Sequence, residues 1–286
     1  MRCGSIQASA ARPSRENPRC IRDDKSIILF LVGDDARNSI DICDVCKMNT
    51  IPILMYHNIS PLPQGGLLPW LYVTPRAFAA HIKLLHWLGF QGLSMGSAMP
   101  YLRGEKHGRI VVITFDDGYV DTFKQALPVL KAYGFSATCY AVSTLIGGYN
   151  VWDAEQINAR KPLMDASQLR AWQDAGMEVG SHSCTHPRLT ACSDEQLVVE
   201  VTESKLQLEE MLRRPITQFS YPYGDFDQRV KEAVRRAGYT SAVTVRRGRT
   251  RRSDDLLQLH RVTISNYHRR PHLAFKVLTR FEDRRA

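Results

Sequence analysis

Between about residue 50 and residue 264, short apolar runs alternate with longer segments whose apolar residues recur at helical spacing. The clearest run, Ile-Val-Val-Ile-Thr-Phe at residues 110–115, is typical of a strand buried on both faces. In residues 74–88 the apolar positions lie three or four apart, which predicts a helix. Repeated strand–helix units predict a parallel sheet, and their number indicates closure into a barrel. We therefore expect an α/β fold, a single-domain distorted (β/α) barrel.

The element boundaries follow from capping residues, glycines and changes of period. We expect strands at 49–57, 110–115, 136–142, 177–181, 218–221, 241–245 and 259–264, and helices at 74–88, 122–132, 165–175, 193–212 and 227–237. The barrel domain then spans residues 49–270, between an N-terminal extension (1–48) and a C-terminal tail (271–286).

The extension is polar and has no sustained period, so we expect it to be disordered or an over-extended start, with translation beginning at Met1 or at Met48. Arginines interrupt any signal-like apolar stretch near the N-terminus, and no apolar run approaches the length of a membrane helix. These features predict a cytoplasmic protein. Cys43 and Cys46 form half of a zinc-site pattern, but no second pair follows at zinc-finger spacing.

The chain has a formal net charge of +9, and arginines crowd residues 246–252. This stretch is either a solvated loop or a patch that attracts an anionic partner, such as a lipid carrier or a membrane surface. Nucleic acid is not expected, because the stretch lacks the interleaved aromatic residues of single-strand binders.

Two adjacent carboxylates, Asp116 and Asp117, follow the apolar run 110–115. Parallel barrels place their chemistry at the carboxyl ends of the strands, and paired carboxylates near a core usually serve a cation or a catalytic step. The alternative is a helix cap and turn, in which aspartate is also common.

His182 and His186 follow the predicted strand 177–181 at a spacing that lets both imidazoles approach one ion. With one carboxylate they would leave coordination positions open, as catalytic metals require. Zinc is the plainest choice for hydrolysis, and cobalt, manganese, iron or nickel would also suit these ligands. The alternative is a pair of solvent-facing loop histidines.

A third pattern, Tyr-Pro-Tyr-Gly at residues 221–224, ends the predicted strand 218–221 and suits either the wall of a cleft or a plain turn. Together the three patterns, with Leu-Met-Tyr-His at 54–57, resemble the polysaccharide deacetylase family, the NodB-like carbohydrate esterases. The resemblance covers about residues 50–265. It implies the NodB-like barrel and hydrolysis of the N-acetyl group of an amino sugar in a polysaccharide, oligosaccharide or glycolipid precursor.

The resemblance also implies roles for individual residues. Asp117, His182 and His186 would bind the divalent metal, and Asp116 would be the catalytic base. The backbone N–H of Tyr223 would hold the oxyanion.

The remaining motifs depart from the family pattern. Ser220 stands where many members have an arginine that steadies the base, and no Asp–Trp motif is evident near residue 240. His260, in an approximate Leu-x-His motif, is the predicted general acid. Pro222 and Trp152 are predicted to contact the sugar together with Tyr223, whereas His57 is expected mainly to pack.

Three other functions remain open. Ser94 lies in a Gly-x-Ser-x-Gly pattern, so a serine esterase is one alternative, although the surrounding strand and helix signals are poor. A non-catalytic carbohydrate-binding protein on the same fold is the second, although a pure binder would have no need of both aspartates. Hydrolysis of a non-sugar amide is the third.

Overall fold

A computed structural model describes residues 50–279 and 281–284, without the side chain of residue 284. The predictions for the extension 1–48, for a start at Met48 and for the pair Cys43 and Cys46 lie outside the described residues.

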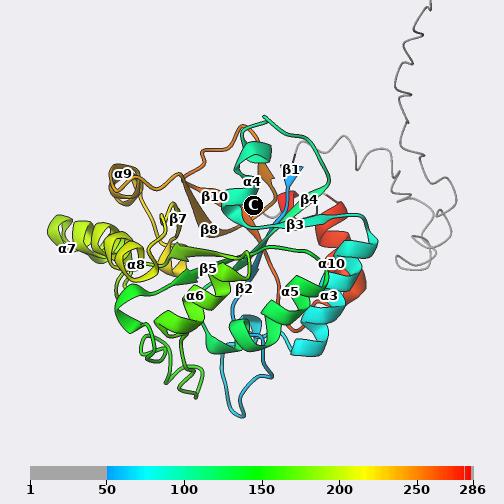
Figure 1. The fold of residues 1–286 in the computed structure, drawn as a ribbon, viewed down its shortest axis with the longest axis horizontal. Coiled ribbons are helices and arrows are strands. Elements are labelled where there is room, and N and C mark those ends of the chain that lie inside the picture. The colour runs from blue at the N-terminus through cyan, green and yellow to red at the C-terminus, as the bar shows by residue number, and fades with distance from the viewer. Residues whose placement is uncertain (1–49, 280, 285–286) are drawn as a thin grey trace, which may run out of the picture. The chain divides into compact units, whose positions relative to one another are not determined.

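Seven parallel strands form a closed ring, as the sequence predicts (Figure 1). Around the ring they follow the order β2 (Ile53–Tyr56), β10 (Leu259–Thr263), β8 (Ser241–Arg247), β7 (Gln218–Ser220), β6 (Glu178–Ser181), β5 (Thr138–Ala141) and β4 (Ile110–Phe115), which pairs back with β2. A further strand, β3 (Gln91–Leu93), pairs with β4 outside this ring. A separate two-stranded antiparallel sheet joins β1 (Thr50–Ile51) to β9 (Thr250–Arg251).

The strands are apolar because both of their faces are covered. All six residues of β4 and all four of β2 are buried. Along β2, Leu54 and Tyr56 belong to the core between strands and helices, and Ile53 belongs to a second core cluster that also holds Val112. Alternation of side chains along each strand separates these two layers.

The predicted helices form with the expected caps. They are α3 (Pro75–Trp87), η2 with α5 (Thr122–Ala126, Leu127–Ala132), α6 (Ala166–Asp174), α7, η5 and α8 (Asp194–Val198, Val199–Glu203, Ser204–Leu212) and α9 (Gln228–Arg236). Thr74 caps α3, and Asp165 and Ser193 form capping boxes at α6 and α7. The helices predicted at 122–132 and 193–212 each contain a π-helical turn.

Several elements were not predicted, among them β3. The strand β3 leads into an unpredicted helix, α4 (Met95–Leu102), which tolerates Pro100 within it. The residues assigned to a C-terminal tail instead form α10 (Arg270–Leu278), which lies beside α3 (Figure 1) and contributes Leu273 and Val277 to the core. The hydrophobic core therefore extends past the predicted boundary at residue 270. No helix in the described ranges has the length and apolar character needed to cross a membrane.

Candidate active site

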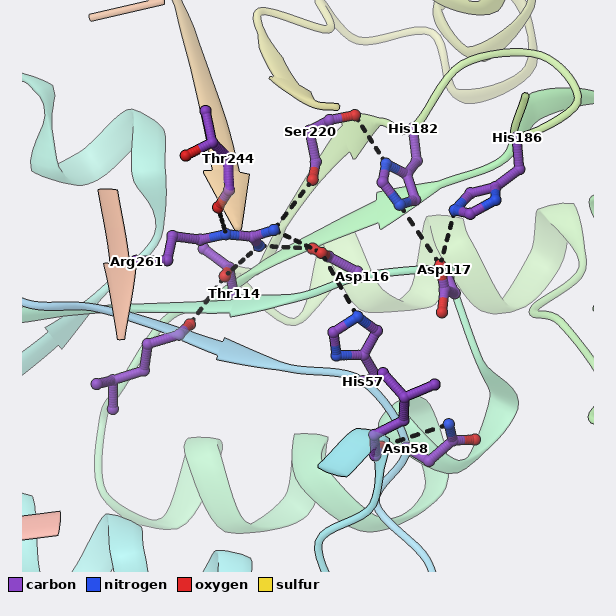
Figure 2. Close-up of polar contacts among 12 residues, drawn as sticks. His57, Asn58, Thr114, Asp116, Asp117, His182, His186, Ser220, Thr244 and Arg261 are labelled. Atoms are coloured by element: carbon purple, nitrogen blue, oxygen red, sulfur yellow. Dashed lines mark hydrogen bonds and ion pairs between the residues drawn. The ribbon is translucent and has the colours of Figure 1, made fainter. Parts of the chain in front are cut away.

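Asp117 and two histidines come together at the carboxyl ends of β4 and β6, the two strands that flank β5. Asp117 follows β4, and His182 and His186 follow β6. The Oδ1 atom of Asp117 lies 3.4 Å from Nε2 of His182 and 3.6 Å from Nε2 of His186 (Figure 2). The ligand atoms of the three residues lie within 4.8 Å of one another, and all three residues are buried. The structure thus brings together the three residues predicted as metal ligands.

Three residues at this site have positive φ angles, which residues other than glycine rarely adopt. Asp117 and His186 have φ angles of 74° and 64°, and Tyr223, in the loop after β7, has a φ of 59°. Such residues persist where surrounding structure enforces them, and they concentrate at functional sites. Gly224 allows the turn at Tyr223, because a Cβ atom there would lie 2.3 Å from Cγ2 of Val245.

Hydrogen bonding fixes the orientation of His182. Its Nδ1 lies 2.7 Å from the carbonyl oxygen of Ser220, an acceptor, so Nδ1 carries the hydrogen and donates it. When His182 is neutral, Nε2 therefore presents its lone pair towards Asp117. A backbone carbonyl that holds the second ring nitrogen is a usual feature of histidine ligands to metals.

The electrostatics of this group fit a cation. Burial raises the pKa of Asp117, but its hydrogen bond with His182 and the histidines around it lower that pKa on balance. Burial lowers the pKa of His182, but Asp117 and Asp116 more than offset this and raise it. Burial, reinforced by His182, lowers the pKa of His186 to about 3 and keeps its imidazole neutral. One carboxylate and two imidazole nitrogens are a donor set that suits a divalent transition metal.

Asp116 is paired with an arginine that the motif analysis missed. The guanidinium of Arg261, on β10, donates from Nη1 to Oδ1 of Asp116 at 2.7 Å and from Nη2 to Oδ2 at 2.6 Å (Figure 2). Arg261 also donates to Thr114 and to the carbonyl of Thr244 and is fully buried. Burial raises the pKa of Asp116, but the charge and hydrogen bonds of Arg261 hold that pKa well below its usual range.

Arg261 accounts for the departure at Ser220, because an arginine from a different strand holds the carboxylate. The Ser220 hydroxyl lies 3.4 Å from Nη2 of Arg261 and accepts from it. The sequence held one signal for this arrangement, since Arg261 alternates with Leu259 on β10 and an arginine at an inward-facing position needs a buried anion.

The structure places His57, and not His260, beside the candidate base. His57 follows β2, and its Nε2 lies 3.8 Å from Oδ2 of Asp116 (Figure 2). His260 neighbours the inward-facing Arg261, so it points to the opposite side of β10, where its Nδ1 lies 3.7 Å from Asp254. This geometry favours His57 over the predicted His260 as the candidate general acid. The sequence contained one indication that His57 lies in the site, because His57 ends a predicted strand.

Aromatic side chains build one wall of the site around His186. The Trp152 ring stacks on the His186 ring with centroids 4.5 Å apart, so one face of the indole is covered. The Tyr223 ring meets His186 edge-on at 4.6 Å and is 42% exposed, whereas Pro222 is buried. Trp152 and Tyr223, predicted to contact the sugar, thus flank a candidate metal ligand, and Tyr223 is open to solvent.

Ser94 has a structural role. It is 4% exposed, and its hydroxyl caps α4 by accepting a hydrogen bond from the N–H of Ser97. Its hydroxyl also donates to the Ser97 hydroxyl, and no histidine among the described residues bonds to it. The serine esterase alternative therefore lacks a base for its nucleophile.

The arginine-rich stretch 246–252 does not form one uniform patch. Arg249 is buried and pairs through Nη2 with Asp283 at 2.7 Å. Arg246 is exposed and lies over the Phe226 ring, whereas Arg252 contacts His107, in the loop before β4. Neither a single solvated loop nor a continuous basic surface describes all of these side chains.

Comparison with known proteins agrees with this geometry. A sequence profile described as "Polysaccharide deacetylase" matches residues 103–242. The chain is 31% identical over 265 residues to YxkH of Bacillus subtilis (strain 168), whose name describes it as a polysaccharide deacetylase. The match covers 92% of this chain and 88% of YxkH. The chain belongs to the polysaccharide deacetylase family.

Other members of the polysaccharide deacetylase family share the barrel. The deacetylase PplD of Streptococcus pyogenes, solved in complex with acetate, superposes with a TM-score of 0.69 at 26% identity over 80% of this chain and 98% of PplD. A peptidoglycan-N-acetylglucosamine deacetylase of Bacillus cereus is 28% identical over 136 residues, which span 47% of this chain and 56% of that enzyme. Like its polysaccharide N-deacetylase relatives, the chain is a hydrolase that acts on carbon–nitrogen bonds other than peptide bonds.

Proposed function

We propose that this protein removes the acetyl group from an N-acetylated amino sugar of a polysaccharide or oligosaccharide, with a divalent metal held by Asp117, His182 and His186. The observation that supports this best is the buried carboxylate of Asp116, paired with Arg261 directly beside the three converging ligands. Zinc is the first candidate metal. A cation bound there would lower the pKa of a water molecule and polarise the acetyl carbonyl.

The residues of the chain have separate roles in this proposal. Asp116 accepts the proton of the attacking water, and Arg261 keeps that carboxylate ionised and oriented. The backbone N–H of Tyr223 donates to the oxyanion that forms on the acetyl carbonyl. His57, 3.8 Å from Asp116, donates a proton to the departing amine.

The names of the relatives support a glycan substrate, but they do not indicate which glycan. One relative is named for peptidoglycan N-acetylglucosamine, and another, from Staphylococcus aureus, for poly-β-1,6-N-acetyl-D-glucosamine. A glycolipid substrate, an anionic lipid carrier at residues 246–252 and a cytoplasmic location remain predictions from the sequence. A non-catalytic carbohydrate binder is less favoured, because burying both Asp116 and Asp117 has a cost that binding alone would not offset.

Acetate release from N-acetylglucosamine oligomers tests the proposal, with metal content of the purified protein measured in parallel. We expect release that stops with a chelator, returns with zinc, and is lost in Asp116→Asn although that variant still binds metal. Release that continues in the chelator would contradict metal dependence. Protein that binds metal but releases acetate only from non-sugar amides would contradict the sugar substrate.

A further inference from the structure

Arg188 stands at the exposed edge of the aromatic wall around His186. Its guanidinium carbon lies 4.7 Å from the centroid of the Tyr223 ring, and Tyr223 in turn contacts His186 at 4.6 Å. Arg188 is thus two ring contacts away from a candidate metal ligand. It is exposed, and it forms no ion pair with any residue in 50–279 or 281–284.

Several contacts hold the backbone segment that follows Arg188. Leu189 is fully buried, and the hydroxyl of Thr190 donates to Asp225 at 2.5 Å, which ties this loop to the loop that carries Tyr223. Arg229, on α9, donates to the carbonyls of Thr190 and Cys192 at 3.1 and 2.9 Å. The Arg188 side chain is therefore presented from a fixed frame, which reduces the conformational entropy lost when it binds a ligand.

A guanidinium stacked on an aromatic face still has its N–H edge available. That edge matches the two oxygens of a carboxylate or phosphate, and such charge-assisted pairs are stronger than hydrogen bonds to neutral hydroxyls. Some exposed cations of the described residues are paired with carboxylates, as Arg214 is with Asp174 and Arg229 is with Asp194, whereas others, such as Lys83 and Lys124, are not. Arg188 differs from these other unpaired cations in its position on the aromatic wall around His186. An unmatched, pre-positioned guanidinium beside the site therefore favours an anionic group on the substrate.

We infer that Arg188 determines specificity by binding an acidic group, a carboxylate or a phosphate, on a sugar next to the N-acetylated one. The preferred substrate is then an anionic glycan, and a neutral homopolymer is a poorer one. This inference rests on the proposed function, because it concerns the same site. Arg188 contributes to substrate binding, and Tyr223 supplies the surface that orients it.

Binding can be measured without turnover on chelator-treated protein. The probes are three oligosaccharides of equal length: neutral N-acetylglucosamine, one alternating with a carboxylate-bearing sugar, and one alternating with a phosphate-bearing sugar. We expect wild-type protein to bind at least one anionic probe about five- to tenfold more tightly than the neutral one at low salt, with a smaller difference at high salt. The two anionic probes distinguish carboxylate from phosphate.

The variants are Arg188→Gln, Arg188→Lys and a matched control, Arg246→Gln. Arg246 is also exposed and also lies 4.7 Å from an aromatic centroid, that of Phe226, a ring that has no ring contact with His186. Arg188→Gln should remove the preference, Arg188→Lys should keep part of it, and Arg246→Gln should keep all of it. Equal binding of all probes, equal weakening of all probes by Arg188→Gln, or loss of the preference in Arg246→Gln would overturn the inference.

Acetate release from the zinc-loaded proteins separates the two proposals. Release that does not depend on substrate charge or on Arg188 leaves the deacetylase proposal standing and removes the specificity role. An Arg188-dependent preference in binding, with no acetate released from any probe, supports the anionic site and contradicts the deacetylase proposal.

Discussion

Arg261 and Asp116 form a two-bond ion pair inside the barrel, between a strand and the end of a strand that is not its neighbour. Strand β10 carries the guanidinium, Asp116 follows β4, and β2 lies between these strands in the ring. Both side chains are almost completely removed from solvent. The pair joins the catalytic proposal to the stability of the fold.

Removing one partner of this pair should be more damaging than removing both. Arg261→Met or Asp116→Asn alone leaves a buried charge uncompensated, and we expect the free energy of unfolding to fall by about 3–5 kcal/mol. The double variant should recover much of that loss, because no buried charge remains. Denaturant unfolding of the four proteins, with metal removed, measures the cycle. Additive losses in the double variant would show that the two residues do not interact.

Activity should follow a different pattern from stability in the same proteins. The double variant should stay inactive, because it has no base at residue 116. Arg261→Lys keeps the charge but not the two parallel hydrogen bonds, so we expect a fall in kcat of about tenfold or more. Wild-type activity in Arg261→Lys would argue against a positioning role for the guanidinium.

Substitutions of His57 and of His260 should have clearly different effects on kcat. We expect His57→Gln to lower kcat by about 100-fold or more, within the range typical of a lost general acid or base, whereas His260→Gln should stay within about twofold of wild type. The pH profile of kcat for His57→Gln should lose its alkaline limb, because the group that must be protonated is gone. A large loss in His260→Gln with an intact His57→Gln would restore the original assignment.

Asp153 should make the metal-free protein less stable as the pH rises. Burial, together with the charge of Asp117, raises the pKa of Asp153 to about 7, well above that of an unfolded aspartate. The folded state then binds the proton more tightly between about pH 4 and pH 7, so the stability gained from protonation is present below pH 4 and lost by about pH 7.

Asp153→Asn tests this direction while keeping an oxygen that can accept the hydrogen bond from Asn150. In a chelator, the variant should gain stability relative to wild type as the pH rises from 4 to 8. Thermal unfolding across that range measures the difference. A constant difference would mean that Asp153 has no raised pKa in the folded protein.

Truncation after residue 270 should destabilise the whole domain. It removes α10, whose Leu273 and Val277 are fully buried in the main core, and the contact of Lys276 with Glu282 at 2.7 Å. We expect the truncated protein to be largely insoluble or to unfold without a cooperative transition. A soluble, cooperatively folded 1–270 protein would show that the barrel does not depend on α10.

The sequence alone determined the barrel and the three residues that form the candidate metal site. The run that forms β4 is short and rich in β-branched residues, which favours a buried strand over a buried helix. The caps Thr74, Asp165 and Ser193 define helix starts through local hydrogen bonds. Asp117, His182 and His186 were recognisable because each lies next to a predicted strand end, and parallel strands bring such ends to the same edge. These features depend on interactions between residues close in sequence.

Only the tertiary structure decided which residues serve Asp116. Arg261 lies 145 residues from Asp116, and no local pattern links them. His260 and His57 could be distinguished only by the direction in which β10 and β2 present their side chains inside a closed ring. Side-chain partners across a barrel depend on strand order and register, which a single sequence does not specify. For the same reason α10 looked like a tail until its apolar face was seen against α3.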